Sequence, residues 1–322
     1  MDATQPTQRR TAAGVRTLAL VVLLLLGASA VVSACGGSST TASSSPSAAT
    51  SAPTASPVIV PAAEPVSRWD APGSASLAQT QVVSRHYASA LSAEKIPSAG
   101  LYTSASTWDY WPSDAHVQGA SEIESIMRDA GSYIDWPKRS HLLAAPGVAV
   151  YEGLTEVYGT STTPSLVLLA VDGGKVTHEE VFLNEGDTRR VTFYASAPGP
   201  KDTAKVAAKV GAAVGDAFET GDRTAVQALV APDILFRDTT LAHGVRGWDA
   251  LLAWWDKVPT VTLENKTPIA GPGWTVVRWT IRQVFSTGVE LALPGATVME
   301  VRGGQVVRMT IYYDSSLMRL QT

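Results

Sequence analysis

The stretch Val301-Arg302-Gly303-Gly304-Gln305-Val306 predicts a β-hairpin, and the chain contains a second version of it. The earlier version is Val171-Asp172-Gly173-Gly174-Lys175-Val176, which begins 130 residues upstream. Gly-Gly between two runs rich in β-branched residues marks a two-residue turn, because glycine accepts the positive φ that such a turn requires. A period of this length is that of a whole domain, so the sequence predicts one domain-sized module present twice.

The elements expected around the two hairpins follow the same order. In residues 71–197 apolar spacing predicts helices at 77–94, 97–102 and 119–127, and strands at 107–112, 140–144, 148–158, 165–171 and 175–183. In residues 201–316 it predicts helices at 205–219, 223–230 and 247–255, and strands at 234–238, 260–268, 274–284, 289–301 and 305–313. Pro198-Gly199-Pro200 would link the two modules, and residues 317–322 would be a tail. We therefore expect an α+β fold.

The second module resembles a known family. Its motifs are Ala217-Phe218, Gly221-Asp222, Phe236-Arg237-Asp238, Trp254-Trp255 and, at the end, Tyr312-Tyr313-Asp314. In this order they resemble the SnoaL-like domain of the nuclear transport factor 2-like superfamily, clearly over 205–314 and more faintly over 75–184. The resemblance implies a cone in which three helices pack on a curved, mixed, mostly antiparallel sheet around a pocket. It implies little about function, because the superfamily contains cyclases, isomerases, hydrolases and many non-enzymes.

The amino terminus resembles that of bacterial lipoproteins. Arg9, Arg10 and Arg16 precede an apolar run at 17–32, and Val32-Ser33-Ala34-Cys35-Gly36 resembles a lipobox. This implies cleavage of residues 1–34, acylation of Cys35 and anchoring on the extracytoplasmic face of the membrane, since several acyl chains make a stable anchor. The alternative is an ordinary secretory peptide. Cys35 is the only cysteine of the chain, so no internal disulfide is expected.

Composition sets further limits. Residues 35–70 are mostly Ser, Thr, Ala and Pro, which predicts a disordered tether. The net charge is −4, and removal of residues 1–34, which carry +2, leaves −6. An acidic protein without a basic stripe is not expected to bind nucleic acid. No metal-ligand spacing and no phosphate-binding glycine loop is present in the sequence, so we expect no cofactor.

The two faces of each predicted sheet differ, because successive side chains of a strand alternate. In the second module one face is apolar and should meet the helices: Val277, Trp279, Ile281, Met299, Val301, Val307, Met309, Ile311 and Tyr313. The other face is mostly basic and includes Arg278, Arg282 and Arg308. The matching face of the first module has an apolar middle and acidic edge, namely Leu154, Phe182, Glu152 and Glu156. We therefore predict that the sheets pack against each other as an intrachain pseudo-dimer, with two separate domains on a linker as the alternative.

Asp238 is the main candidate for a general base in the second module. It follows an apolar strand and matches the position of the base in ketosteroid isomerases, which resemble this fold; the plainer interpretation is a turn aspartate. His243 in the adjacent loop could exchange protons with Asp238, although loop histidines are usually only solvated. Trp248, Trp255, Trp279, Met309 and Tyr313 are expected to line the pocket, and aromatic residues there would favour a hydrophobic or ring-shaped ligand.

The first module offers different groups. Tyr87 lies on the long helix where the isomerases place an oxyanion donor, whereas the second module has Val214 there. Asp109 or Tyr110 would occupy the place of the base. Glu179 aligns with Met309 and should point inward, where a carboxylate is costly unless paired; a one-residue register error would turn it outward. Neither module therefore carries the complete set for isomerase chemistry.

These observations lead to a functional hypothesis with two alternatives. We expect a lipoprotein that binds a small hydrophobic ligand or a protein partner without chemistry. The first alternative is a SnoaL-like acid–base enzyme (cyclase, isomerase or hydrolase type) that acts on a cyclic or polyketide-like substrate with Asp238 as base. The second is a structural scaffold at the cell envelope.

Overall fold

The computed structural model describes residues 69, 73–92, 100–111, 115–130, 134–135, 141–157, 161–184, 196–238, 241, 243–257, 262–265, 268–284 and 290–314, which belong to one compact unit, Ala62–Thr322. The expected signal sequence, Cys35, the tail 317–322 and the tether residues other than Trp69 lie outside the described residues. No described helix is both long and apolar enough to cross a membrane.

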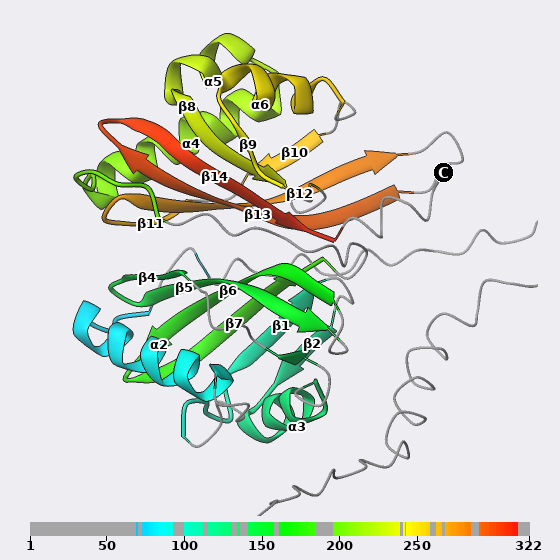
Figure 1. Ribbon diagram of the computed structural model, residues 1–322. Coiled ribbons are helices and arrows are strands. Elements are labelled where there is room, and N and C mark those ends of the chain that lie inside the picture. The colour runs from blue at the N-terminus through cyan, green and yellow to red at the C-terminus, as the bar shows by residue number, and fades with distance from the viewer. Residues whose placement is uncertain are drawn as a thin grey trace, which may run out of the picture. The chain divides into compact units, whose positions relative to one another are not determined.

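The first half forms a mixed sheet with helices on one face (Figure 1). Its elements are α2 (Leu77–Ser92), β1 (Thr107–Trp111), β2 (Ala115–Gln118), α3 (Ala120–Ala130), β3 (Ile134–Asp135), β4 (His141–Ala145), β5 (Val148–Val157), β6 (Ser161–Asp172) and β7 (Lys175–Leu183). The strand order is β2-β1-β7-β6-β5-β3, with β4 also paired to β5. Only the β1–β7 pair is parallel among these described strands. Of the helix expected at 97–102, residues 97–99 lie outside the described ranges, and Gly100 and Leu101 form a turn.

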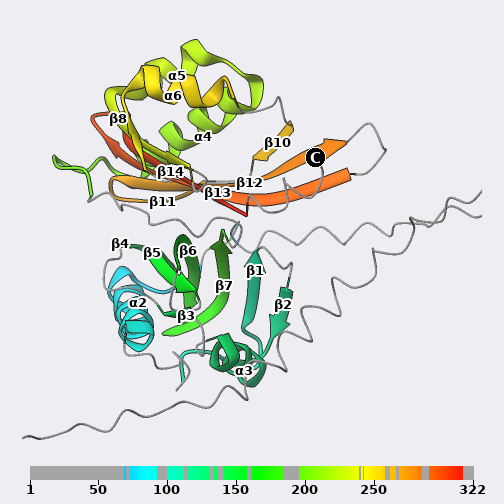
Figure 2. The same ribbon diagram turned by 45° about the vertical axis from the view of Figure 1, so that its right-hand side comes forward.

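The second half has the same strand order. Its elements are α4 (Ala204–Thr220), α5 (Arg223–Leu229), β8 (Val230–Asp238), β9 (Val245–Arg246), α6 (Trp248–Trp255), β10 (Thr262–Asn265), β11 (Ile269–Gly271), β12 (Trp274–Val284), β13 (Glu290–Arg302) and β14 (Gln305–Tyr313). The order β9-β8-β14-β13-β12-β10, with β11 also on β12, matches the first half strand for strand, and β8 pairs with β14 in parallel. Figure 2 shows α4, α5 and α6 together over one face. The predicted α+β fold class is confirmed.

Both glycine pairs form the predicted hairpins. Gly173-Gly174 joins β6 to β7 and Gly303-Gly304 joins β13 to β14, with φ of 52° and 76° in the first turn and 59° and 77° in the second. One expected position is wrong. The pairing passes from Val301↔Val306 directly to Glu300↔Arg308, so Val307 is the extra residue of a β-bulge. As a result Val306, not Val307, is fully buried in the helix-facing core.

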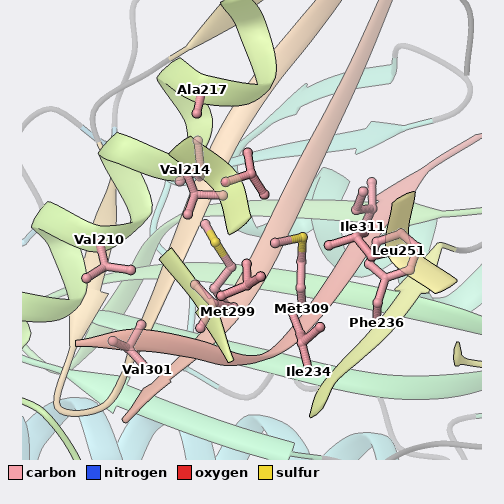
Figure 3. Close-up of a cluster of buried hydrophobic side chains, with 14 of the residues drawn as sticks. Val210, Val214, Ala217, Ile234, Phe236, Leu251, Met299, Val301, Met309 and Ile311 are labelled. Atoms are coloured by element: carbon pink, nitrogen blue, oxygen red, sulfur yellow. The ribbon is translucent and has the colours of Figure 1, made fainter. Parts of the chain in front are cut away.

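That core fills the space between the helices and the second sheet. Helix α4 is capped at its start by Thr203, whose hydroxyl accepts from the Val206 N–H, and at its end by Gly221, which has a positive φ of 70°. Between these caps its buried face meets the sheet. Figure 3 shows Val210 and Val214 of α4 on one side of Met299 and Met309, with Phe236 and Leu251 on the other. Close packing of these side chains holds the layer of helices against the sheet.

The other faces of the two sheets pack against each other, as predicted. One buried apolar cluster takes residues from both halves: Ala145, Val148, Val150, Leu166, Leu168, Ala170 and Phe182 from the first, and Ile269, Trp274, Val276, Ala296, Val298 and Tyr312 from the second. Trp69, which composition assigns to the tether, also belongs to this cluster and donates from Nε1 to Glu180 at 2.9 Å.

Charged pairs cross the same interface. Arg308 binds Glu152 through both terminal guanidinium nitrogens, Nη1 and Nη2, and Arg278 binds Glu180 at 2.5 Å. Arg282 and Leu154 are half-buried, and Leu154 is not one of the residues of the apolar cluster. The side chain of Glu156 lies outside the described set. The opposite charges predicted for the two faces thus meet at Glu152 and Arg308.

Candidate functional site

Glu179 of β7 is a buried carboxylate on the helix-facing side of the first sheet. It is 0% exposed, and three donors from other parts of the first half surround its carboxylate. Tyr87 of α2 donates from its hydroxyl to Oε1 at 2.7 Å, Trp108 of β1 donates from Nε1 to Oε1 at 3.2 Å, and the Tyr102 hydroxyl donates to Oε2 at 2.5 Å. Glu179 points inward, as predicted, and Tyr87, which was predicted only to lie on the long helix, is one of its donors.

Burial shapes the acid–base properties of this cluster. Desolvation raises the pKa of Glu179 to about 7, although the hydrogen bonds from Tyr102, Tyr87 and Trp108 act in the opposite direction. Burial and the nearby Glu179 carboxylate raise the pKa of Tyr87 and of Tyr102 well above 10.0. Glu179 can therefore exchange a proton near neutral pH, while the two phenols remain donors. Tyr102 and Trp108 were not predicted from the sequence. Trp108 could have been, because the alternation of side chains along β1 points it toward the helices.

Of the two candidates for the place of the base, Asp109 does not line this site, which corrects its expected role as a pocket residue, whereas Tyr110 faces the helices. Strand β1 turns Trp108 and Tyr110 toward the helices, where their rings stack with centroids 5.3 Å apart. Asp109 lies on the opposite face, since neighbouring side chains alternate. There its carboxylate contacts Nδ1 of His116 at 2.9 Å and Nε2 of His178 at 3.5 Å. Among the described residues no cluster of three or more His, Cys, Asp or Glu side chains suits a metal ion.

In the second half Asp238 is buried at the end of β8 on the helix-facing side. The Tyr313 hydroxyl donates to Asp238 Oδ1 at 3.3 Å, and the Tyr313 and Trp279 rings lie 6.0 Å apart. His243 is exposed to solvent, as expected of a solvated loop histidine.

The expected pocket residues of the second half lie together and pack in or against its hydrophobic cluster. Met309 is fully buried and Trp279 is 8% exposed, while Trp248 and Trp255 pack against the same cluster. Val214 occupies the α4 position that faces them and is buried as well. Trp279 also lies flat against Gly295, where an added Cβ would come within 2.3 Å of the ring. These side chains act as core in the described structure.

An open groove lies elsewhere, between elements of both halves. Its volume is about 440 Å³, which falls within the range of roughly 300–1,000 Å³ typical of ligand sites. Helix α2, strand β4, the start of the second half and the β11–β12 turn line it through Leu77, Gln81, Arg85, Leu142, Leu143, Ala144, Lys201, Pro272 and Trp274. Sequence reasoning missed this site, because its residues come from four segments that only the packing of the two sheets brings together.

Comparison with known proteins identifies the second half. Residues 210–309 match the family model of the SnoaL-like domain, so this stretch is a SnoaL-like domain. Among solved structures, the chain is similar to a nuclear transport factor 2-like protein of unknown function from Burkholderia pseudomallei, with 24% identity, 36% of this chain and 98% of that chain covered, and a TM-score of 0.33. The candidate polyketide cyclase IdmH from Streptomyces antibioticus gives 20% identity, 35% and 95% coverage, and a TM-score of 0.31.

A candidate ketosteroid isomerase from Kribbella flavida gives 16% identity, 34% and 78% coverage, and a TM-score of 0.30. No curated protein matches the chain.

Proposed function

We propose that this chain is a lipid-anchored, extracytoplasmic protein that binds a small hydrophobic ligand without chemical turnover. The observation that carries this proposal is the position of the open space. The groove of about 440 Å³ is lined mainly by apolar side chains, whereas the described apolar side chains around Glu179 and Asp238 belong to buried hydrophobic clusters. A concave, mostly apolar surface with a few polar groups is the usual form of a ligand site.

The internal carboxylates support a binding role over catalysis. Both oxygens of Glu179 already accept hydrogen bonds from side chains of this chain, and its donors Tyr87 and Tyr102 are almost completely buried. A general base must lie within hydrogen-bond reach of the substrate proton that it removes. At Glu179 a substrate would first have to displace a tyrosine.

The proposed membrane anchor rests on the lipobox-like sequence at Cys35. The matching strand order of the two halves supports one duplicated SnoaL-like module. Substitution Cys35→Ala tests the anchor. The unchanged chain should be found in the membrane fraction and should incorporate labelled palmitate, whereas the Cys35→Ala chain should incorporate none and leave that fraction. Equal membrane association of both chains, without label, would refute the anchor.

Binding is tested with the neutral fluorescent probe phenylnaphthylamine and the full Cys35→Ala chain. We expect saturable binding that Ala144→Phe reduces, because the added ring occupies groove volume. Val82→Phe is the matched control, since Val82 is an exposed apolar residue of α2 that does not line the groove. Binding that neither substitution changes would place the ligand elsewhere and contradict the proposal.

A second candidate function is acid–base catalysis in the first half, and the pKa of about 7 at Glu179 favours it. In that case Glu179, not Asp238, would be the base, with Tyr87 or Tyr102 as the donor to a developing oxyanion on a cyclic substrate. Turnover of a cyclic ketone that Glu179→Gln abolishes and Asp238→Asn preserves would establish this alternative. Saturable binding in both variants without turnover in the unchanged chain would favour the binding role.

A further inference from the structure

We infer that the groove binds an anionic, single-tailed amphiphile of the fatty-acid class, with the acid group between Arg85 and Lys201 and the tail over Leu142, Leu143 and Trp274. This inference names the ligand class of the groove and rests on the proposed binding function.

Two exposed leucines lie at the apolar side of the groove. Leu77 and Leu142 are each 38% exposed, and they are two of the four large apolar side chains that the described part of the chain presents to solvent. Both border the groove. Exposed apolar residues that gather at a concavity indicate a binding surface, since covering them removes apolar area from water.

The indole of Trp274 is fixed in place beneath this surface. Trp274 is almost completely buried and packs in the cluster between the sheets. Its ring also lies over Gly271, where an added Cβ would come within 2.4 Å of the indole. The aromatic part of the groove lining is therefore rigid, which lowers the cost of ordering it around a ligand.

The charges of the groove are of one sign. Arg85 and Lys201 are the only ionisable residues among the described residues that line it, and both side chains are exposed. The Nε of Arg85 donates to the Gln81 carbonyl at 3.0 Å, which holds the side chain along α2. A protein with a net charge of −4 thus places two cations beside an apolar hollow. The partner that matches both features has an acid group joined to an apolar body.

The size of the groove limits the tail. A volume of about 440 Å³ lies near the lower end of ligand sites, at roughly 300–1,000 Å³. One short acyl chain fits this space better than the two chains of a diacyl lipid. The inference therefore concerns a free amphiphile and not the membrane surface.

Calorimetry of the full Cys35→Ala chain with dodecanoate and with dodecanol at pH 8 tests the inference. The two probes have the same chain length and differ in charge. We expect dodecanoate to bind at least about tenfold more tightly, which corresponds to about 1.4 kcal/mol, and we expect added salt to reduce this preference. Arg85→Glu combined with Lys201→Glu should abolish the preference. Lys205→Glu combined with Lys209→Glu, on exposed positions of α4 outside the groove, should leave it unchanged.

The outcomes separate the two levels of the proposal. Equal affinity for both probes, lost in Ala144→Phe, would overturn the anionic preference and leave the binding function standing. Binding of neither probe, while phenylnaphthylamine still binds, would overturn the amphiphile class. If the chain with the unchanged groove binds none of the three probes, both the proposed binding function and the amphiphile class are overturned. Binding of anionic vesicles that Ala144→Phe does not change would assign the two cations to a membrane surface and would also overturn the inference.

Discussion

Arg308 of β14 and Glu152 of β5 lie 156 residues apart in the chain and form a two-pronged ion pair between the sheets, with Nη2–Oε2 at 2.5 Å and Nη1–Oε1 at 3.1 Å. Both side chains are buried, at 1% and 0% exposure. Glu300 accepts from Arg308 Nε at 2.7 Å, and the Tyr312 hydroxyl donates to Glu152 at 2.8 Å. A carboxylate of the first half is therefore held in its ionised form by donors of the second.

Removal of one partner of this pair should weaken the packing of the two halves and lower the stability of the protein. Arg308→Met leaves Glu152 buried without its arginine, whereas Glu300 keeps its ion pair with Arg302 at 3.1 Å. Loss of one partner of a buried pair costs about 3–5 kcal/mol. We expect a lower midpoint of urea unfolding, or two transitions in place of one. The matched control is Arg246→Ala, whose partner Asp233 is 3.6 Å away at an exposed site, and which should change stability by less than about 0.5 kcal/mol.

The double variant Arg308→Met, Glu152→Leu extends this test. If the pair acts as a unit, the second substitution should restore part of the stability, because the buried carboxylate is then removed as well. Losses that simply add would show that the two residues stabilise the protein independently.

Glu152 should make the paired sheets sensitive to acid. Burial alone would raise the pKa of Glu152, but the Arg308 charge and hydrogen bonds from His141, Arg308 and Tyr312 lower it to about 2 from 4.5. A carboxylate with a lowered folded-state pKa contributes stability above its unfolded pKa and loses it as the pH falls toward the folded value. We expect the free energy of unfolding to decrease between pH 4.5 and about 2, and this decrease should be smaller in Glu152→Gln.

Glu179 should have the opposite effect at higher pH. Its pKa is raised from 4.5 to about 7 by burial, so the folded state binds the proton more tightly than the unfolded state. The contribution of the protonated group is complete below pH 4.5 and is lost as the pH rises through about 7. The loss is on the order of 3 kcal/mol at about 1.4 kcal/mol per pKa unit. Unfolding in urea at pH 5 and pH 8 should reveal it.

Glu179→Gln should remove most of this pH dependence while the decrease at acidic pH remains. The comparison between two pH values cancels any general cost of the substitution, which is why it is more informative than stability at one pH. An unchanged difference between pH 5 and pH 8 in the variant would mean that another group titrates.

The sequence predicted the repeated order of elements because local patterns determine it. Gly-Gly pairs, β-branched runs and strand alternation are visible in neighbouring residues, and they correctly indicated the hairpins, the inward direction of Glu179 and the contact of the two sheets. Alternation fails where the register changes, as it does at Val307, because a bulge adds a residue that no local pattern marks. The choice between Asp109 and Tyr110 stayed open in the sequence because the register of a short strand cannot be read from five residues, and the structure turns Tyr110 inward.

Long-range partners were beyond the sequence for a different reason. The three donors to Glu179 come from α2, β1 and the segment between them, so only the packed helix and sheet bring their side chains to one carboxylate. The groove depends on the docking of two halves, and its cations Arg85 and Lys201 are more than a hundred residues apart. The local pattern of one segment does not indicate which distant segment will pack against it.

The turn of the second hairpin should require a residue that tolerates a positive φ at position 304. Gly304 has φ of 77°, an added Cβ there would meet nothing within 4 Å, and its N–H donates to Asp202 at 2.9 Å. Any loss of stability on substitution of Gly304 therefore comes from the strain of a positive φ in the backbone and not from a steric clash. Gly304→Val should cost about 1–2 kcal/mol, and Gly304→Asn should cost less, because asparagine tolerates positive φ. Urea unfolding of the two variants checks this order, and a larger loss for asparagine than for valine would show that the turn does not require this backbone conformation.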